Sequence, residues 1–147
     1  MKNLLTILLI GITSFLYGQC IKGDCKNGEG TYKYHDGSSY VGGWKNGNLH
    51  GEGTYVFKNG DKYVGGYVNG EGTGIGKMYW KGGDRYEGEF KHSRMCGQGT
   101  MNYANGQKYV GQWFDGKMHG QGVLHYYCGK RQITQKGRFE NGVFKGG

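Results

Sequence analysis

The chain has 147 residues, enough for one domain, but 33 of them are Gly, none is Pro and only 35% are hydrophobic. Such a chain buries too little surface for an ordinary two-layer globule, so its 13 Tyr, 6 Phe and 3 Trp residues predict short strands joined by tight turns. The formal net charge of +8 favours anionic partners, such as acidic lipid headgroups, polyanions or acidic proteins, without choosing among them.

The segment 1–19 is predicted to be a helical secretory signal peptide that does not belong to the fold. Lys2 supplies a positive start, and residues 4–12 form an apolar run. This run is too short to span a bilayer stably. The sequence is compatible with cleavage after Gly18 and after Gln19. We therefore expect an exported protein, whether periplasmic, cell-surface or secreted.

Four cysteines follow the predicted signal peptide. Cys20 and Cys25 lie close together and are predicted to form a disulfide at the N-terminal edge in an oxidising compartment. A lone Cys-x4-Cys pair lacks the second ligand pair of a zinc site, so no metal is expected. Cys96 and Cys128 are expected to be unpaired, buried thiols. Lipid anchoring at Cys20 is the alternative, although Gln19 stands where lipoprotein signals place a small residue.

A period of 23 residues governs the rest of the chain. Four units begin with a tyrosine, at Tyr40, Tyr63, Tyr86 and Tyr109. A fixed period near 20 residues is typical of repeat architectures. The predicted division is a signal peptide (1–19), an N-terminal cap with a half repeat (20–39), four repeats (40–62, 63–85, 86–108 and 109–134, the last with a three-residue insertion) and a C-terminal half repeat (135–147).

Two turn signals recur in each unit. Counted from the leading tyrosine, positions 7–8 and 20–21 are rich in Asn-Gly and Asp-Gly, which supply the positive φ angles of two-residue hairpin turns. We therefore expect an all-β fold, an elongated single-layer antiparallel sheet of stacked β-hairpins, in which each unit contacts only its neighbours. The insertion around Arg131 to Thr134 predicts either a bulge or a local loop.

Side-chain parity places rings and glycines on the same face of the predicted sheet. Tyr40, Gly42 and Trp44 share a side of the first strand, and Gly53 and Tyr55 share a side of the second. A ring lying over a glycine covers backbone, so most rings are assigned to packing rather than to stacking on sugars or bases. The predicted packing residues are Tyr40, Trp44, Tyr63, Tyr67, Tyr86, Phe90, Tyr109 and Trp113.

A cation recurs once per unit at position 23. Its parity places it on the polar face, and two strands per unit give steps of about 10 Å. A row of this kind fits an anionic lipid surface or an acidic polymer, with salt-sensitive binding. The alternative is a solvated edge that discourages strand-to-strand aggregation. The four cations are Lys62, Arg85, Lys108 and Arg131.

No arrangement typical of catalysis stands out. His50 and His119 occupy the same repeat position three units apart, about 30 Å, and cannot share a metal or a catalytic site. Residues 70–77 look like a phosphate loop but lack its first Gly and the Ser or Thr after Gly-Lys. We therefore expect no enzyme, no catalytic residue, no metal, no cofactor and no nucleic acid partner.

The pattern Tyr-x-Gly-x-Trp/Phe-x-x-Gly-x-x-His-Gly-x-Gly resembles the MORN repeat (membrane occupation and recognition nexus). Residues 40–53 and 109–122 match it at every anchor position, whereas Thr73 and Cys96 replace the histidine in the second and third units. The resemblance covers nearly all of residues 27–147 and, with the predicted signal peptide, indicates a protein of the exported bacterial type. It implies an extended sheet of stacked hairpins.

The function implied by this resemblance is a non-enzymatic scaffold that mediates protein–protein interaction. The alternative is association with an anionic phospholipid membrane through the repeated Lys/Arg positions. The expected partner is an unidentified protein. An exposed terminal hairpin also predicts a dimer formed edge to edge.

Overall fold

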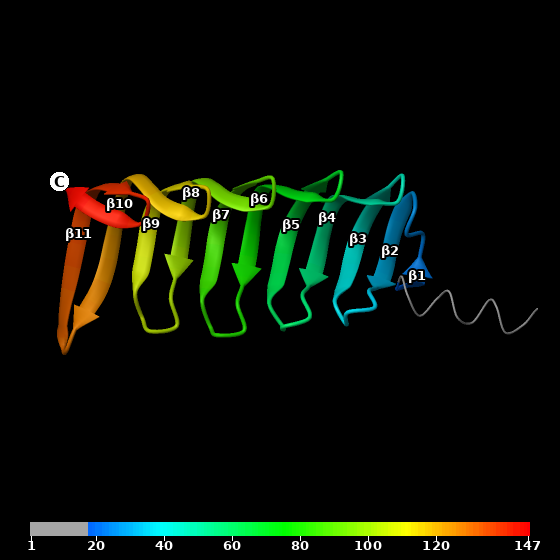
Figure 1. Cartoon of the computed structure of the whole chain (residues 1–147), viewed down its shortest axis with the longest axis horizontal. Coiled ribbons are helices and arrows are strands. Elements are labelled where there is room, and N and C mark those ends of the chain that lie inside the picture. Colours follow the sequence, from blue (N-terminus) through cyan, green and yellow to red (C-terminus); the bar gives the residue numbers. More distant parts are fainter. Residues whose placement is uncertain (1–17) are drawn as a thin grey trace, which may run out of the picture.

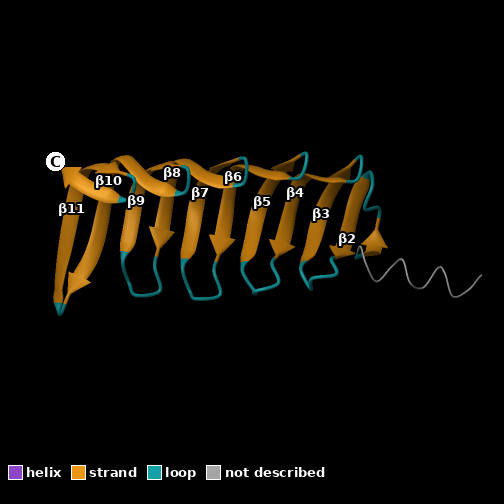
Figure 2. Cartoon of the chain, in the orientation of Figure 1, coloured by secondary structure: helices purple, strands orange, loops and turns teal. Residues whose placement is uncertain are grey.

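The computed structural model describes residues 18–147, which form one open antiparallel sheet of twelve strands (Figure 1). Each strand is bonded only to its neighbours in the chain, and the described part is made of strands and turns without a helix (Figure 2). The predicted all-β sheet of stacked hairpins is confirmed. The predicted signal helix lies outside the described residues. The strands are β1 (Gln19–Gly23), β2 (Gly28–Lys33), β3 (Ser39–Lys45), β4 (Asn48–Val56), β5 (Lys62–Val68), β6 (Glu71–Tyr79), β7 (Arg85–Lys91), β8 (Arg94–Asn102), β9 (Lys108–Phe114), β10 (Lys117–Cys128), β11 (Arg131–Glu140) and β12 (Val143–Gly146).

The turn at positions 7–8 has the predicted tight geometry. Asn46 and Gly47 connect β3 to β4 with φ angles of 51° and 76°. Two successive left-handed residues are what a type I′ turn needs, and Asn-Gly supplies them with little strain. These turns also bind the preceding unit, since the Gly70 N–H donates to the carbonyl oxygen of Leu49 at 2.9 Å.

The turn at positions 20–21 is longer than the predicted two-residue turn. Five residues, 57–61, connect β4 to β5. The side-chain oxygen of Asn59 accepts the Asp61 N–H at 3.0 Å, and only Gly60 of the Asn-Gly pair is left-handed. Asn59 thus stabilises a wider loop through its side chain instead of adopting the left-handed conformation. Asp61 in turn accepts the N–H of Lys81 in the next loop at 2.9 Å, which ties successive loops together.

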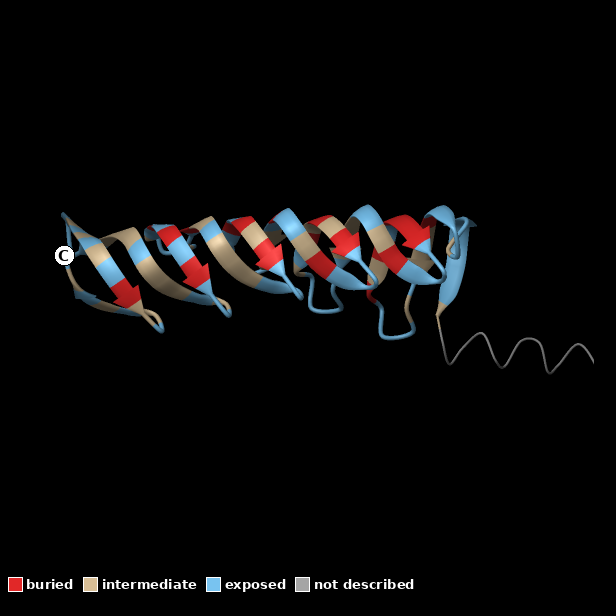
Figure 3. Ribbon diagram, turned by 90° about the horizontal axis from the view of Figure 1, so that it is seen from above, coloured by how far each residue is buried: buried red, intermediate tan, exposed pale blue. Residues whose placement is uncertain are grey.

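A bulge in the second strand of each unit curves the sheet. Between the pairs Gly42↔Gly53 and Trp44↔Leu49, β3 advances by two residues while β4 advances by four. Gly51 lies in this stretch at φ 72°, and its counterparts at φ 71°, 55° and 59° lie in β6, β8 and β10. Bulges increase local twist and bend the strand. Seen from above, the strands wind like a coil, with buried segments recurring along the array (Figure 3).

The core lies on the concave face and consists of rings over glycines. Tyr40 is 0% exposed, and a Cβ added to Gly42 or Gly53 would lie 2.6 or 2.2 Å from its hydroxyl oxygen. That hydroxyl donates to the carbonyl oxygen of Gly43 at 3.1 Å, so the buried O–H is satisfied. The tyrosines that begin the other units, Tyr63, Tyr86 and Tyr109, cover the equivalent glycines.

Edge-to-face ring contacts join the units into one core. Tyr40 contacts Trp44 of its own unit and Tyr67 of the next, with ring centroids 5.3 Å apart in both pairs. The same alternation continues to Phe139, and such pairs add about 0.5–1.5 kcal/mol each beyond area burial. All eight rings assigned to packing from the sequence are buried here: Tyr40, Trp44, Tyr63, Tyr67, Tyr86, Phe90, Tyr109 and Trp113.

The insertion in the fourth unit lengthens a hairpin. The strands β10 and β11 pair without a register shift from Gly120↔Phe139 to Cys128↔Arg131. Gly129 and Lys130 make the turn between them. The extra residues therefore continue both strands, and the predicted bulge or loop is wrong. Regular pairing satisfies the backbone N–H and C=O groups that a loop would leave to water.

Candidate interaction surfaces

The concave face contains an apolar groove with a pocket of about 410 Å³ near the middle of the array. Tyr63, Tyr67 and Phe90 form its floor, because positions 1 and 5 of each unit point into the curve of the sheet. Leu49 and Met95 line one side. Apolar pockets of this size, with few polar groups, are typical of binding sites. The other side is formed by Tyr55, Phe57, Met78 and Trp80.

Position 18 supplies a row of rings along the groove that cover no glycine. Phe57 is 39% exposed, and the other members are half-buried. The sequence assigned most rings to covering glycines, but the tyrosines at position 1 alone perform that task in the four complete units. The rings at position 18 therefore remain accessible to a partner. They are Tyr34, Phe57, Trp80, Tyr103 and Tyr126.

The opposite rim of the groove is built by the two-residue turns, and the turn of the third unit departs from the repeat. His92 and Ser93 replace the usual Asn-Gly or Asp-Gly, yet both are left-handed, at φ 49° and 60°. The Nδ1 atom of His92 lies 2.6 Å from a carboxylate oxygen of Glu71, and Arg94 forms an ion pair with Asp115. This rim was not among the sites predicted from the sequence, although a position-by-position comparison of the units reveals its departure from the repeat.

The position-23 cations do not all fall in one row. On the convex face, Lys62 and Arg85 both pair with Tyr79, and Arg85 and Lys108 both pair with Asn102, which aligns the three cations across the sheet. We call Lys62, Arg85 and Lys108 the cation row. All three are exposed.

Arg131 lies away from the cation row. The partner of Lys108 is His125, and His125 pairs with Thr134, three residues along β11 from Arg131. Arg131 instead pairs with Cys128 at the tip of the long hairpin. The extra residues of the fourth unit thus displace Arg131 by about 10 Å along the strand. The expected row of four cations is a row of three.

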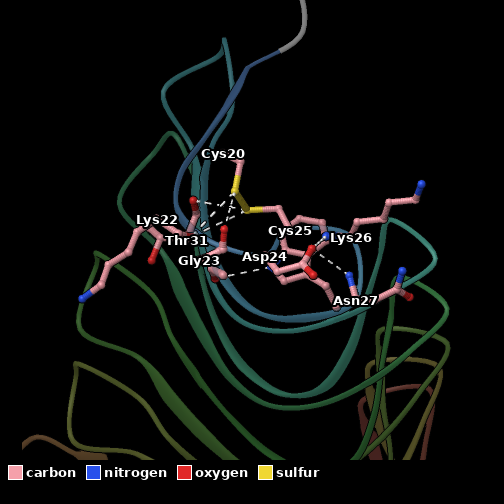
Figure 4. Close-up of a disulfide and its surroundings, with 10 residues drawn as sticks. Cys20, Lys22, Gly23, Asp24, Cys25, Lys26, Asn27 and Thr31 are labelled. Atoms are coloured by element: carbon pink, nitrogen blue, oxygen red, sulfur yellow. Dashed lines mark hydrogen bonds between the residues drawn. A yellow bond between two sulfur atoms is a disulfide. The ribbon is translucent and has the colours of Figure 1, made fainter.

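A disulfide joins Cys20 and Cys25 at the N-terminal end of the array (Figure 4). A Cβ added to Gly30 would lie 2.8 Å from the sulfur of Cys25. Gly30 pairs with Gly42 just as Gly53 does on the other side, so the disulfide covers a glycine where the complete units use a tyrosine ring. Cys96 and Cys128 are free, but neither is the buried thiol that the sequence predicted: Cys96 is half-buried and Cys128 is exposed.

The histidines do not form a metal site in the described part of the chain. The Nδ1 atoms of His50 and His119 are buried without a hydrogen-bond partner. Across residues 18–147, no three His, Cys, Asp or Glu side chains come together as metal ligands would. Over the same residues, no helix has the length and apolar character needed to cross a membrane.

Five consecutive segments of the chain match the sequence model of a family described as "MORN repeat". Together they cover more than half of the chain, and four of them begin at the periodic tyrosines. A search of curated proteins found no match. The matching segments are residues 22–39, 40–62, 63–85, 86–108 and 109–130.

Proposed function

Since this chain belongs to the MORN repeat family, we propose that it is an exported, non-enzymatic scaffold that binds a protein partner through its concave groove. Members of this family are typically non-catalytic and are generally implicated in association with proteins or membranes. Export is supported by the N-terminal sequence and by the disulfide, which is typical of oxidising compartments.

The row of rings at position 18 carries this proposal. These rings line the groove, cover no glycine and recur once per unit, about every 10 Å. Aromatic residues are enriched at protein interfaces because they bury a large area with little loss of conformational freedom. A single row of such rings offers a partner contacts in several successive units.

A photo-crosslinking experiment tests the groove as the binding surface. A photoreactive amino acid replaces Trp80 in the groove or, as the control, Val41 on the convex face, which is 53% exposed. After irradiation of producing cells, we expect one discrete adduct from position 80 and none from position 41. The same adducts from both positions, or none from position 80, would overturn the proposal.

Mass spectrometry of the purified chain tests export and anchoring together. Cleavage of the predicted signal peptide leaves Gln19 or Cys20 as the first residue, with Cys20 bonded to Cys25. A chain that retains Met1 would contradict export. A lipid mass on Cys20 would instead show the anchored alternative, which also removes the disulfide.

The cation row supports membrane association as a second function. Lys62, Arg85 and Lys108 lie in register on an exposed face, a pattern suited to anionic headgroups. The test compares a K62S/R85S/K108S variant with a K58S/K130S/R131S control of equal charge in co-sedimentation with phosphatidylserine vesicles. We expect only the row variant to lose its salt-sensitive binding. Equal binding by the two variants would remove the row from this role.

A further inference from the structure

The pocket in the groove lies where one unit lacks a side chain. Position 10 holds Leu49, Met95 and Met118 in the first, third and fourth units, but Gly72 in the second. In those three units the side chain is buried in the core or packed against it. Gly72 leaves that place empty, and the pocket opens there between Leu49 and Met95.

The backbone at Gly72 does not require glycine. Its φ angle is not among the positive ones, so a side chain could be accommodated without left-handed strain. An added Cβ would approach the Tyr63 ring and hydroxyl at 3.3 Å, compared with 2.7 Å at Gly76, which Tyr63 covers. The glycine at position 72 therefore serves to leave space rather than to allow a conformation.

The rim beside this space is held in place by the unusual turn of the third unit. The Ser93 hydroxyl accepts the Gly72 N–H at 3.0 Å, and the Ser93 N–H donates to the Gly72 carbonyl oxygen at 2.9 Å. In the other complete units position 8 is glycine, which has no hydroxyl to offer. The two departures from the repeat, Gly72 and Ser93, therefore belong to one feature. A rim fixed before binding reduces the entropy lost on association.

The positive charge of Arg94 at the rim indicates which charged group of a partner would lie beside an apolar side chain in the pocket. Arg94 is the only charged residue among the described residues that line it. Its side chain is 68% exposed, and its pair with Asp115 uses one of its two terminal nitrogens. The remaining N–H groups of a guanidinium can bind a second carboxylate.

We propose that the Gly72 pocket is the anchor site for the protein partner, and that it receives one bulky apolar side chain beside a carboxylate that Arg94 binds. This inference rests on the proposed function of the groove. It fits the usual anatomy of interfaces, in which a central, well-packed pocket contributes most of the affinity and surrounding contacts exclude water. Here the rings at position 18 provide the surrounding contacts.

Filling the pocket tests the inference. Gly72→Leu installs the side chain of the first unit, whereas Gly82→Leu adds the same side chain in a loop where an added Cβ meets nothing within 4 Å. With the photoreactive residue at position 80 of the full chain, we expect Gly72→Leu to reduce the adduct by about tenfold or more. Gly82→Leu should leave the adduct unchanged.

Separate outcomes distinguish the pocket from the groove. An adduct that persists in a folded Gly72→Leu variant overturns the anchor pocket and leaves the proposed function standing. No adduct in the parent overturns both. If circular dichroism shows that leucine disturbs folding, Gly72→Ala and Arg94→Gln take its place. Each of these variants should lower the yield of the adduct at position 80. An unchanged adduct yield in both variants overturns the anchor pocket.

A small amphipathic anion combines an apolar chain with a carboxylate, as the proposed protein partner does. A titration with dodecanoate distinguishes a small ligand from a protein partner. Saturable quenching of tryptophan fluorescence that Gly72→Leu abolishes, together with full protection of position 80 from crosslinking, would identify a small ligand and overturn the protein anchor. We expect no saturation with dodecanoate.

Discussion

At the residue scale, the repeat depends on a reciprocal requirement between tyrosine and glycine. The Tyr86 ring occupies the space that side chains at Gly88 and Gly99 would need. Its hydroxyl donates to the Glu89 carbonyl oxygen at 3.2 Å, so the ring cannot turn away without losing this partly buried hydrogen bond. The glycines therefore recur in each unit because the tyrosine ring needs their space, and a substitution at one would displace a ring of the core.

Gly99→Ala should destabilise the chain because it displaces the Tyr86 ring. The added Cβ would lie 2.3 Å from the Tyr86 hydroxyl oxygen. Overpacking of this kind lowers the free energy of unfolding by about 1–3 kcal/mol. Urea denaturation measures it, with Gly82→Ala as the control because that site is open and not left-handed. Equal midpoints for the two variants would contradict the packing role.

Stability should fall in alkaline solution because the core contains tyrosine hydroxyls. Burial raises the pKa of Tyr40, Tyr63 and Tyr109 from 10 to about 12. The folded chain thus holds these protons more tightly than the unfolded chain. The resulting stabilisation is complete below pH 10 and is lost as the pH rises to about 12. Unfolding midpoints between pH 8 and 12 measure the loss.

A variant separates this effect from general alkaline damage. Tyr63→Phe removes one titrating hydroxyl and should make the decline shallower, although it starts from a lower stability because the bond to Gly66 is lost. A decline of the same steepness in both proteins would mean that other groups are responsible.

At the scale of elements, the turn motifs and side-chain alternation within each unit predicted the fold. They did not predict the contacts between units. The Asn-Gly pairs of both turns look alike in sequence, but Asn46 is left-handed whereas Asn59 bonds through its side chain. The bulge could not be detected from the alternation of side chains in the sequence. It inserts two residues, so the side chains before and after it point to the same face of the sheet. Its curvature makes the groove.

The site depends even more on distant residues. Gly72 and Ser93 are 21 residues apart and meet only because adjacent units stack. The displacement of Arg131 could be predicted only by knowing that the inserted residues continue β10 and β11. Each of these features is a relation between units, which a motif within one unit does not contain.

The disulfide should stabilise one edge of the array and little else. The double substitution Cys20→Ser and Cys25→Ser removes the disulfide, uncovers Gly30 and frees a short loop. We expect the free energy of unfolding at this edge to fall by about 2 kcal/mol. Because units contact only their neighbours, we expect faster amide hydrogen exchange in β1 and β2 and unchanged exchange in β7 to β9. Faster exchange throughout the array would show that the edge supports the whole sheet.

At the scale of the molecule, the described chain is a rod one sheet thick. Twelve strands at about 4.8 Å spacing give a length of roughly 53 Å. The two end strands, β1 and β12, each have one unpaired edge, which keeps edge-to-edge dimerisation a prediction. Light scattering after gel filtration would reveal such a dimer as a doubled mass.

Small-angle X-ray scattering checks the shape. A compact domain of about 130 residues has a radius of gyration of roughly 14 Å. A rod of this length and a width of about 20 Å should give about 17 Å or more for the chain that begins at Gln19. A value near 14 Å for a monomer would contradict the open array.

Strand order has a consequence for how the molecule forms. Because β1 to β12 pair strictly in succession, no strand waits for a partner from the far end of the chain. Contacts between neighbours keep contact order low for an all-β protein, and low contact order favours rapid folding. A chain that emerges N-terminus first from a ribosome can therefore fold progressively. Each new hairpin then adds to a finished edge, and the disulfide cap is completed first.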